Sequence, residues 1–238
     1  MRLEIDNSDI PVLCRACEAR HGGICGALDP AELLRLGKMT SRQRYPARTI
    51  LLTPGEHTEY CSNILNGVVK VSKLLPDGRQ QVVELQFAPD FLGHPFAAES
   101  NVFIETASAV ELCSFPRHML KSMTAESAAL QNRLHRQVLR QLDQARDWMM
   151  TLGQKTAAEK VASFLIMLAG HLHPSEADRS KSFDLTLSRM DIADFLGLTT
   201  ETVSRQLTAL RKAGVIHIDK ARHVSIINPQ GLRAAAAQ

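Results

Sequence analysis

The segment from Ala125 to Leu152 contains neither glycine nor proline, and this length of uninterrupted chain limits what the protein can fold into. Apolar residues recur along it at spacings of three and four, which is the period of one face of an α-helix. The stripe consists of Leu130, Leu134, Val138, Leu142, Ala145, Met149 and Leu152. A stripe that continues for more than about six turns fits a seam between two long helices better than the core of a small domain. We predict a dimerisation helix over residues 125–152, and the alternative is one helix that lies on the chain's own β-domain.

The residues before this helix show the short runs of a β-domain. β-branched runs begin at Thr49, Val68, Val82 and Val102, and glycines separate them. Residues 75–79 read LPDGR, which places proline ahead of Asp-Gly as a tight hairpin turn requires. We therefore predict a β-roll over residues 31–124, preceded by a cysteine-rich head over residues 1–30.

Residues 153–238 combine short helices with short strands. A helix is expected from Ala157 to His171, Ser188 caps a second one, and Gly197 separates it from a third that Thr199 or Thr200 caps. The residues expected on the inner faces of the second and third helices are Met190, Ile192, Ala193, Leu196, Val203, Leu207 and Leu210. Residues 215–218 and 224–227 then alternate as a two-stranded wing around Lys220 and Arg222. This order of elements predicts a winged helix-turn-helix, which places its second helix in the major groove of DNA.

The start of the third helix carries side chains that read base edges. Arg205 can donate two hydrogen bonds to guanine, Glu201 can accept one from cytosine, and Thr200 and Ser204 lie beside them. Arg211 and Lys212, further along the helix, are expected to reach only backbone phosphates. Six lysines and arginines against two acidic residues give residues 199–233 a charge of +4, whereas the whole chain carries +3. The alternative is that Glu201 and Arg205 form an ordinary surface pair at i,i+4.

The sequence from Leu187 to Arg205, LSRMDIADFLGLTTETVSR, closely resembles the winged helix-turn-helix of the Crp/Fnr transcription regulators, and the resemblance extends over about residues 14–230. It implies an α+β fold. An N-terminal β-roll of the cyclic-nucleotide-binding type (a double-stranded β-helix) senses a signal, a long helix makes the homodimer, and a C-terminal domain reads palindromic DNA. Glu201, Ser204 and Arg205 match the Glu-x-x-Ser-Arg reader of the Fnr branch, which implies half-sites of the type TTGAT and RNA polymerase as a partner.

The roll departs from the Crp pattern where a cyclic nucleotide would bind. Crp members hold the phosphate with a Gly-Glu pair followed downstream by Arg-Ser or Arg-Thr. Residues 91–96 here read FLGHPF, and no arginine lies between Arg79 and Arg117. We therefore expect that the chain binds no cyclic nucleotide and that the roll is a scaffold.

The cysteines are the remaining candidate sensor. The chain starts with acidic residues instead of a signal peptide and has no apolar run long enough to span a membrane, so we expect a cytoplasmic protein. In a reducing compartment its five cysteines indicate metal or redox chemistry rather than disulfides. Cys14, Cys17 and Cys25 are close in sequence, and Cys113 alternates with Glu111, so that it can point out of the roll toward them. Cys61 begins a strand and is expected to be a small buried thiol.

Four thiolates are what a [4Fe-4S] cluster requires. The Fnr branch uses three N-terminal cysteines and one before the dimerisation helix, a pattern that Cys14, Cys17, Cys25 and Cys113 fit, and the spacing between Cys17 and Cys25 resembles the FnrN-type subgroup. The resemblance thus implies an oxygen-responsive activator of anaerobic or microaerobic genes, in which the intact cluster favours the dimer. Ala145 stands where oxygen-labile Fnr proteins are expected to hold a charge, so that dimerisation here is expected to depend less strictly on the cluster.

Other classes of function remain open on the cysteines alone. Cys14, Cys17, His21 and Cys25 could hold zinc as a Cys₃His set, and a thiol switch without metal is a further alternative. An enzyme finds no support, because the chain has no glycine-rich phosphate loop, no His-Glu-x-x-His and no Cys-x-x-Cys at the start of a helix in a βαβ unit.

Overall fold

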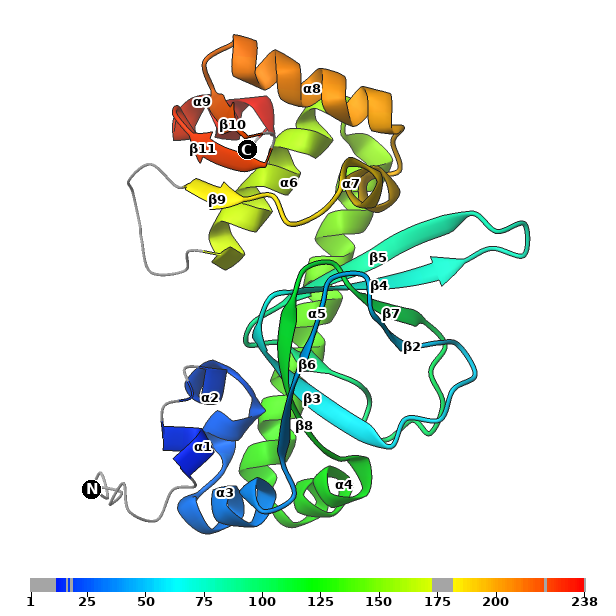
Figure 1. Ribbon diagram of the computed structural model, residues 1–238, viewed down its shortest axis with the longest axis vertical. Coiled ribbons are helices and arrows are strands. Elements are labelled where there is room, and N and C mark those ends of the chain that lie inside the picture. The colour runs from blue at the N-terminus through cyan, green and yellow to red at the C-terminus, as the bar shows by residue number, and fades with distance from the viewer. Residues whose placement is uncertain (1–11, 16, 18, 173–181, 221, 238) are drawn as a thin grey trace. The chain divides into compact units, whose positions relative to one another are not determined.

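The computed structural model describes residues 12–15, 17, 19–172, 182–220 and 222–237 (Figure 1). Residues 1–11, part of the predicted cysteine-rich head, lie outside the described residues. The chain divides into two compact units, residues 1–73 with 84–142 and residues 74–83 with 143–238. The division falls inside the long helix instead of at Gly153, and each unit is described by itself.

The first unit contains the predicted β-roll, whose strands form two four-stranded sheets. One sheet has the order β1-β8-β3-β6 and the other β2-β7-β4-β5. The strands are β1 (Ser41–Tyr45), β2 (Ile50–Leu52), β3 (Tyr60–Asn66), β4 (Val68–Leu74), β5 (Gln80–Phe87), β6 (Phe91–Leu92), β7 (Phe103–Thr106) and β8 (Val110–Pro116). The β-branched runs became β2, β4, β5 and β7. Strand β1 carried no such signal, because its side chains are mostly exposed and polar.

The predicted hairpin turn joins β4 and β5. Gly78 adopts a φ of 88°, which glycine reaches without strain, and its amide donates to the carbonyl of Leu75 at 2.9 Å. The tip of this hairpin belongs to the second unit, where the Gln81 side-chain amide donates to the carbonyl of Phe195 at 3.2 Å.

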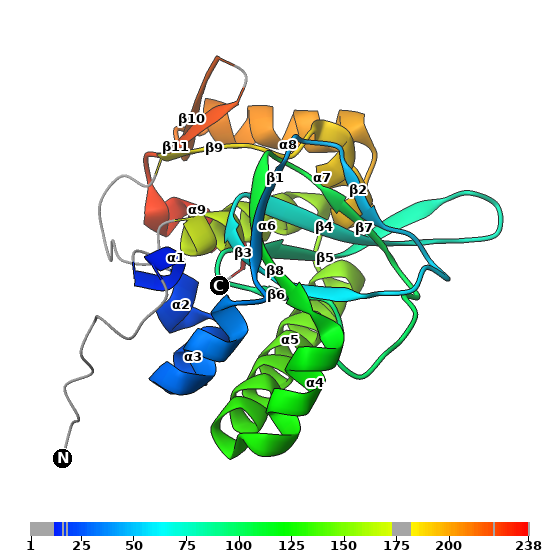
Figure 2. The same ribbon diagram turned by 60° about the horizontal axis from the view of Figure 1, so that its bottom comes forward.

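The head and the helices after the roll complete the first unit. They are α1 (Val12–Arg15), α2 (Ala19–Gly22), the 3₁₀ helix η2 (Ile24–Ala27), α3 (Pro30–Gly37) and α4 (Arg117–Glu126). Asp29 and Glu32 form a capping box that starts α3. A core of buried apolar residues joins the head, the roll and the helices, and α4 lies beside the first part of the next helix, α5 (Figure 2). The members of this apolar core include Ile24, Leu33, Leu36, Phe115, Leu120, Met123, Leu130 and Leu134.

Helix α5 (Ala128–Gln154) is the predicted long helix with corrected ends. Ser127 has an extended backbone that terminates α4, so that Ala125 and Glu126 belong to α4. Gly153 lies inside α5, which ends two residues after the predicted Leu152.

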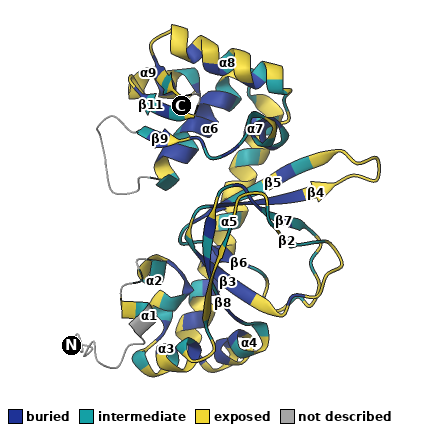
Figure 3. Cartoon of the chain, viewed as in Figure 1, coloured by how far each residue is buried: buried dark blue, intermediate teal, exposed yellow. Residues whose placement is uncertain are grey.

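The predicted seam of α5 needs a larger correction, because it divides into two parts. Leu130 is fully buried and Leu134 is 7% exposed, and both pack in the chain's own core, so neither side chain can meet a second copy. Val138, Leu142 and Met149 are 52%, 43% and 72% exposed. The alternative interpretation, a helix that lies on its own domain, therefore holds for the first turns of α5. Figure 3 shows the burial of each segment.

Most residues of α5 after Gln137 are exposed, and among the exposed residues one set at spacings of three and four differs from the predicted stripe at its start. It runs through His135, Val138, Leu142, Ala145 and Met149, whose spacings alternate between three and four. This is the heptad period of a two-helix seam. The exposed face of α5 therefore begins at His135, one residue after the Leu134 of the predicted stripe.

The second unit holds the helix-turn-helix. Its elements are α6 (Ala157–Leu172), β9 (Ser182–Asp184), α7 (Arg189–Leu196), α8 (Thr200–Lys212), β10 (Ile216–Asp219), β11 (His223–Ile226) and α9 (Pro229–Ala235). The wing has three strands in the order β10-β11-β9, one more than predicted. Met190, expected on the inner face of α7, is 64% exposed, whereas Ile192 and Leu196 are buried. Among the described residues, no helix is both long and apolar enough to cross a bilayer.

Candidate DNA-reading surface and cysteine site

Local hydrogen bonds set the two helices of the reading motif. The Ser188 hydroxyl accepts from the Asp191 amide at 3.1 Å and Asp191 returns the bond to Ser188, which makes a capping box for α7. Gly197 ends α7 in the left-handed region with a φ of 61°. The Thr199 hydroxyl then accepts from the Thr202 amide at 3.2 Å and caps α8.

Helix α8 separates its apolar face from its polar face. Val203, Leu207 and Leu210 are buried, whereas Glu201, Ser204 and Arg205 are exposed, and Thr200 is half-buried. The exposed residues lie in the first turns of the helix, which is the part that enters a major groove.

The electrostatics of Glu201 come from the start of its own helix. A backbone amide, followed by the hydroxyls of Thr199 and Thr200, lowers the pKa of Glu201. The Thr200 hydroxyl donates to the carboxylate at 3.1 Å. Within the described residues, Glu201 and Arg205 form no ion pair, so the structure gives no support to the surface-pair interpretation.

Further positive charge lies at the far end of α8 and on the wing. Arg211 and Lys212 are exposed in the last turn of the helix, where cations also complement the helix dipole. Lys220 and Arg222 flank the turn between β10 and β11 and are exposed. These positions suit contacts to phosphates.

The first unit brings four cysteines to one pocket. Cys14, Cys17, Cys25 and Cys113 all line it. Cys14 comes from α1, Cys25 from η2 and Cys113 from β8. The sheet register places Cys113 between Arg42 of β1 and Asn63 of β3, and both of these residues line the same pocket, as does Arg20.

Burial controls the protonation of these thiols. Burial, followed by the charges of neighbouring cysteines, raises the pKa of Cys25 to about 12 and that of Cys113 to about 11. Burial and then Cys17 also raise the pKa of Cys14. The thiols of Cys14, Cys25 and Cys113 are therefore protonated at neutral pH, and a bound metal would have to displace their protons.

The donor set suits a thiolate-ligated cluster, although the side chains do not converge on a metal position. In the described part of the chain, no group of three or more His, Cys, Asp or Glu residues is arranged to hold a metal ion. The Asn63 side-chain amide instead donates to Cys25 Sγ at 3.3 Å. Four thiols on one pocket fit the ligand requirement of a four-iron cluster, provided that their side chains reorient toward a common centre.

The zinc alternative's histidine and the fifth cysteine, expected to be a buried thiol, do not line this pocket. His21, the nitrogen ligand of the zinc alternative, is exposed and does not line it. Cys61 is 1% exposed in the core, and burial raises its pKa to about 12.

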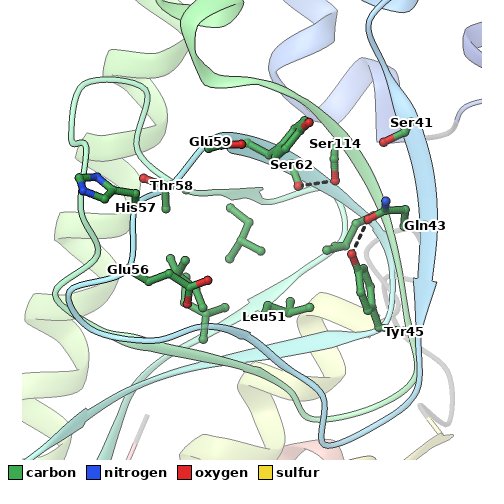
Figure 4. Close-up of a pocket in the computed structure, with 16 residues that line it drawn as sticks. Ser41, Gln43, Tyr45, Leu51, Glu56, His57, Thr58, Glu59, Ser62 and Ser114 are labelled. Carbon is green, nitrogen blue, oxygen red and sulfur yellow. Dashed lines mark hydrogen bonds between the residues drawn. The ribbon is translucent and has the colours of Figure 1, made fainter.

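The roll also contains two larger cavities. One, of about 510 Å³, is drawn in Figure 4; there the Ser62 and Ser114 hydroxyls lie 2.7 Å apart and the Tyr45 hydroxyl donates to the Gln43 side chain. The other, of about 520 Å³, lies between the roll and α5. It contains Glu84, whose pKa is raised by burial and whose carboxylate accepts from the Gln141 amide at 3.1 Å. Neither lining includes a lysine or an arginine among the described residues.

A β-roll, a long helix with exposed apolar residues, and a helix-turn-helix with exposed polar side chains at the start of its second helix define a DNA-binding regulator of transcription rather than an enzyme. Comparisons with known proteins place the chain more narrowly. A family model described as a Crp-like helix-turn-helix domain matches residues 159–235, and one described as a cyclic nucleotide-binding domain matches residues 42–127.

Individual relatives match nearly the whole chain. A probable transcriptional activator of Rhizobium leguminosarum bv. viciae is 50% identical over 225 residues, which cover 94% of this chain and 93% of the relative. The transcriptional activator protein FnrL of Cereibacter sphaeroides is 34% identical over 216 residues, covering 90% and 87%. The solved structure of FixK2 from Bradyrhizobium japonicum is 29% identical with a TM-score of 0.76, and the match covers 84% of this chain and 98% of that one. The chain belongs to the Crp/Fnr family of transcription regulators.

Sequence reasoning did not find the residues that surround the cysteines. Asn63 and Arg42 come from strands far from the head in sequence, and nothing in their local pattern relates them to Cys25 or Cys113. Nothing in the sequence pattern of α5 relates Arg133 to the head, although its guanidinium donates to carbonyls of the head.

Proposed function

We propose that this DNA-binding transcriptional activator responds to oxygen through a [4Fe-4S] cluster held by Cys14, Cys17, Cys25 and Cys113. The observation that carries the proposal is that three head cysteines and one cysteine of β8 line a single pocket. The name of the relative FnrL agrees with an Fnr-type regulator.

The chain's own residues account for how such a cluster would act. A cluster supplies an oxygen-labile bond network that ties the head to β8. Cys25 and Cys113 lie on elements that the core fixes, Asn63 orients the Cys25 sulfur, and Arg20 and Arg42 add positive charge next to anionic thiolates. Without a cluster the head would no longer be tied to β8 through it, and a dimer that would hold the cluster better than the monomer would be weakened.

DNA reading follows from two copies of α8. In a homodimer joined through the exposed stripe of α5, the two reading helices would enter major grooves about 34 Å apart, as a palindrome requires. We propose TTGAT-type half-sites, with Arg205 on the guanine and Glu201 and Ser204 beside it. RNA polymerase is the expected further partner of an activator.

We further propose that no cyclic nucleotide binds. A cyclic phosphate needs a cationic or strongly donating partner, whereas the cavity between the roll and α5 presents a carboxyl group, Glu84, and no arginine or lysine among the described residues.

The test is an absorbance spectrum of the anaerobically purified full chain, with iron and acid-labile sulfide assays. We expect about four irons and four sulfides per chain, lost on exposure to air. Single serine substitutions at Cys14, Cys17, Cys25 and Cys113 should each abolish the cluster, and Cys61→Ser is the matched control that should keep it. Zinc without sulfide would favour the structural-zinc alternative, and neither metal would favour the thiol switch; both results refute the cluster.

A further inference from the structure

Arg133 connects α5 to the cysteine-bearing head. Its Nη2 donates to the carbonyl oxygens of His21, at 3.2 Å, and Gly22, which lie at the end of α2. Its Nε is buried and has no hydrogen-bond partner within the described residues. In the same part of the chain, Arg133 supplies both of the hydrogen bonds that α5 side chains donate to residues 19–27, which we name the docked segment.

The docked segment is held tightly on its other sides. An added Cβ at Gly22 would lie 2.5 Å from Cγ of Pro89, so that the backbone approaches the roll as closely as only glycine allows. Ile24 is fully buried in the core, and Asn63 donates to Cys25. A segment with these contacts moves as a unit with its carbonyls, which are the acceptors for Arg133.

Arg133 also occupies a defined place on α5. It lies between the buried Leu130 and Leu134, and about one turn before Val138, which is 52% exposed. Arg136 and Arg140, on the same helix, are exposed. The buried Nε fixes the guanidinium against α5 while Nη2 holds the two carbonyls, so a shift of the segment breaks the contact by which Arg133 joins the head to its helix.

We propose that Arg133 is the positioning residue that transmits the state of the cysteine site to the dimerisation face of α5. This inference rests on the proposed function and names how that site is coupled to the dimer. When the head is tied to β8, the carbonyls of His21 and Gly22 stay in place and Arg133 holds α5 in the position that presents Val138 and Leu142. When the head is released, Arg133 loses its acceptors and α5 loses that position. The two states thus differ in the contacts of one side chain, as a coupling between sites requires.

The experiment compares the dimer Kd of the full chain with and without the cluster, by anaerobic sedimentation, together with iron and sulfide content. For the wild type we expect the Kd to differ at least about fivefold between the two states. Arg133→Ala should keep its iron, and the ratio of its dimer Kd without the cluster to its dimer Kd with the cluster should lie within about twofold of one. Arg136→Ala, which removes an exposed arginine on the same helix, should keep the wild-type ratio.

Arg133→Lys keeps the charge but cannot reach two carbonyls equally well, so its ratio of Kd values should lie between those of the wild type and the alanine variant. The lysine variant replaces the alanine variant if the latter does not fold. A wild-type ratio in Arg133→Ala would overturn the proposal, as would a loss of iron in proportion to a loss of stability, which is the result of a purely structural role.

A wild-type chain without iron would refute the proposed function instead. Hydrogen exchange of the metal-free chain then tests whether Arg133 holds the head. Arg133→Ala should accelerate exchange at the amides of Gly23, Gly26 and Leu28, which donate within or next to the docked segment, and unchanged exchange would overturn the inference.

Discussion

Leu142 tests whether the uncovered stripe of α5 is the dimer interface. Its side chain is 43% exposed, and full burial of a leucine side chain is worth about 1.5–3 kcal/mol. In a symmetric dimer the exposed portion is covered on both helices, which amounts to about 1–3 kcal/mol. Leu142→Ala should therefore raise the dimer Kd about 5- to 100-fold, and Leu142→Glu should raise it further because it places two like charges in the seam.

Leu130 is the matched contrast on the same helix. It is fully buried in the chain's own core, so Leu130→Ala leaves a cavity that costs about 2–5 kcal/mol of the stability of the first unit. The sequence alone assigns both residues to the same seam. The structure instead predicts that Leu130→Ala lowers the melting temperature with little direct effect on dimer affinity, whereas Leu142→Ala does the reverse.

Anaerobic sedimentation at several protein concentrations measures the dimer Kd, and thermal denaturation followed by circular dichroism at a low concentration measures the stability of the monomer. An unchanged Kd in both Leu142 variants would refute the seam. A Leu130→Ala chain that melts like the wild type would refute the core in which that residue is placed.

Three further predictions concern reading, capping and thiol reactivity. Arg205→Ala should lose about 1–3 kcal/mol of binding free energy at the guanine position and flatten the base preference there. Lys212→Ala should instead weaken binding to all sequences alike and reduce the slope of log K against log salt concentration by about one. Binding isotherms on single-base operator variants distinguish these results, and an unchanged preference profile for Arg205→Ala would contradict its role. Ser188→Ala removes the hydroxyl that caps α7 and should destabilise the second unit by about 1 kcal/mol, measured by denaturant titration, with Ser204→Ala on the exposed face of α8 as a control that stays within about 0.5 kcal/mol. In the metal-free chain the raised pKa of Cys25, about 12, keeps its thiolate fraction low, so its alkylation rate should rise about tenfold per pH unit from pH 8 to pH 10; a rate that levels off near pH 9 would contradict the burial of this thiol.

Local patterns in the sequence determine the elements of this protein. The LPDGR turn, the Ser188 cap, Gly197 and the alternation of Val203, Leu207 and Leu210 depend on interactions within a few residues, and the structure contains each of them. The family follows from the same kind of information, because the motif that carries the resemblance is one continuous stretch of sequence, from Leu187 to Arg205.

Tertiary structure decided which faces are covered. A helical period identifies an apolar stripe but not its partner, so the sequence assigned Leu130 and Leu134 to a second copy of the chain, although the head and α4 bury them. The same limit applies to Met190, whose position near the start of α7 leaves it exposed.

The cysteine site shows most clearly which contacts follow from the sequence and which follow only from the tertiary structure. The sequence paired Cys113 with the head from strand alternation and family resemblance. The β3–β8 and β1–β8 registers bring Asn63 and Arg42 to it, and the docking of α2 gives Arg133 its acceptors. Pairing between strands and packing between helices join residues that are distant in the chain, and the free energy of such contacts depends on the whole fold, so no local pattern contains them.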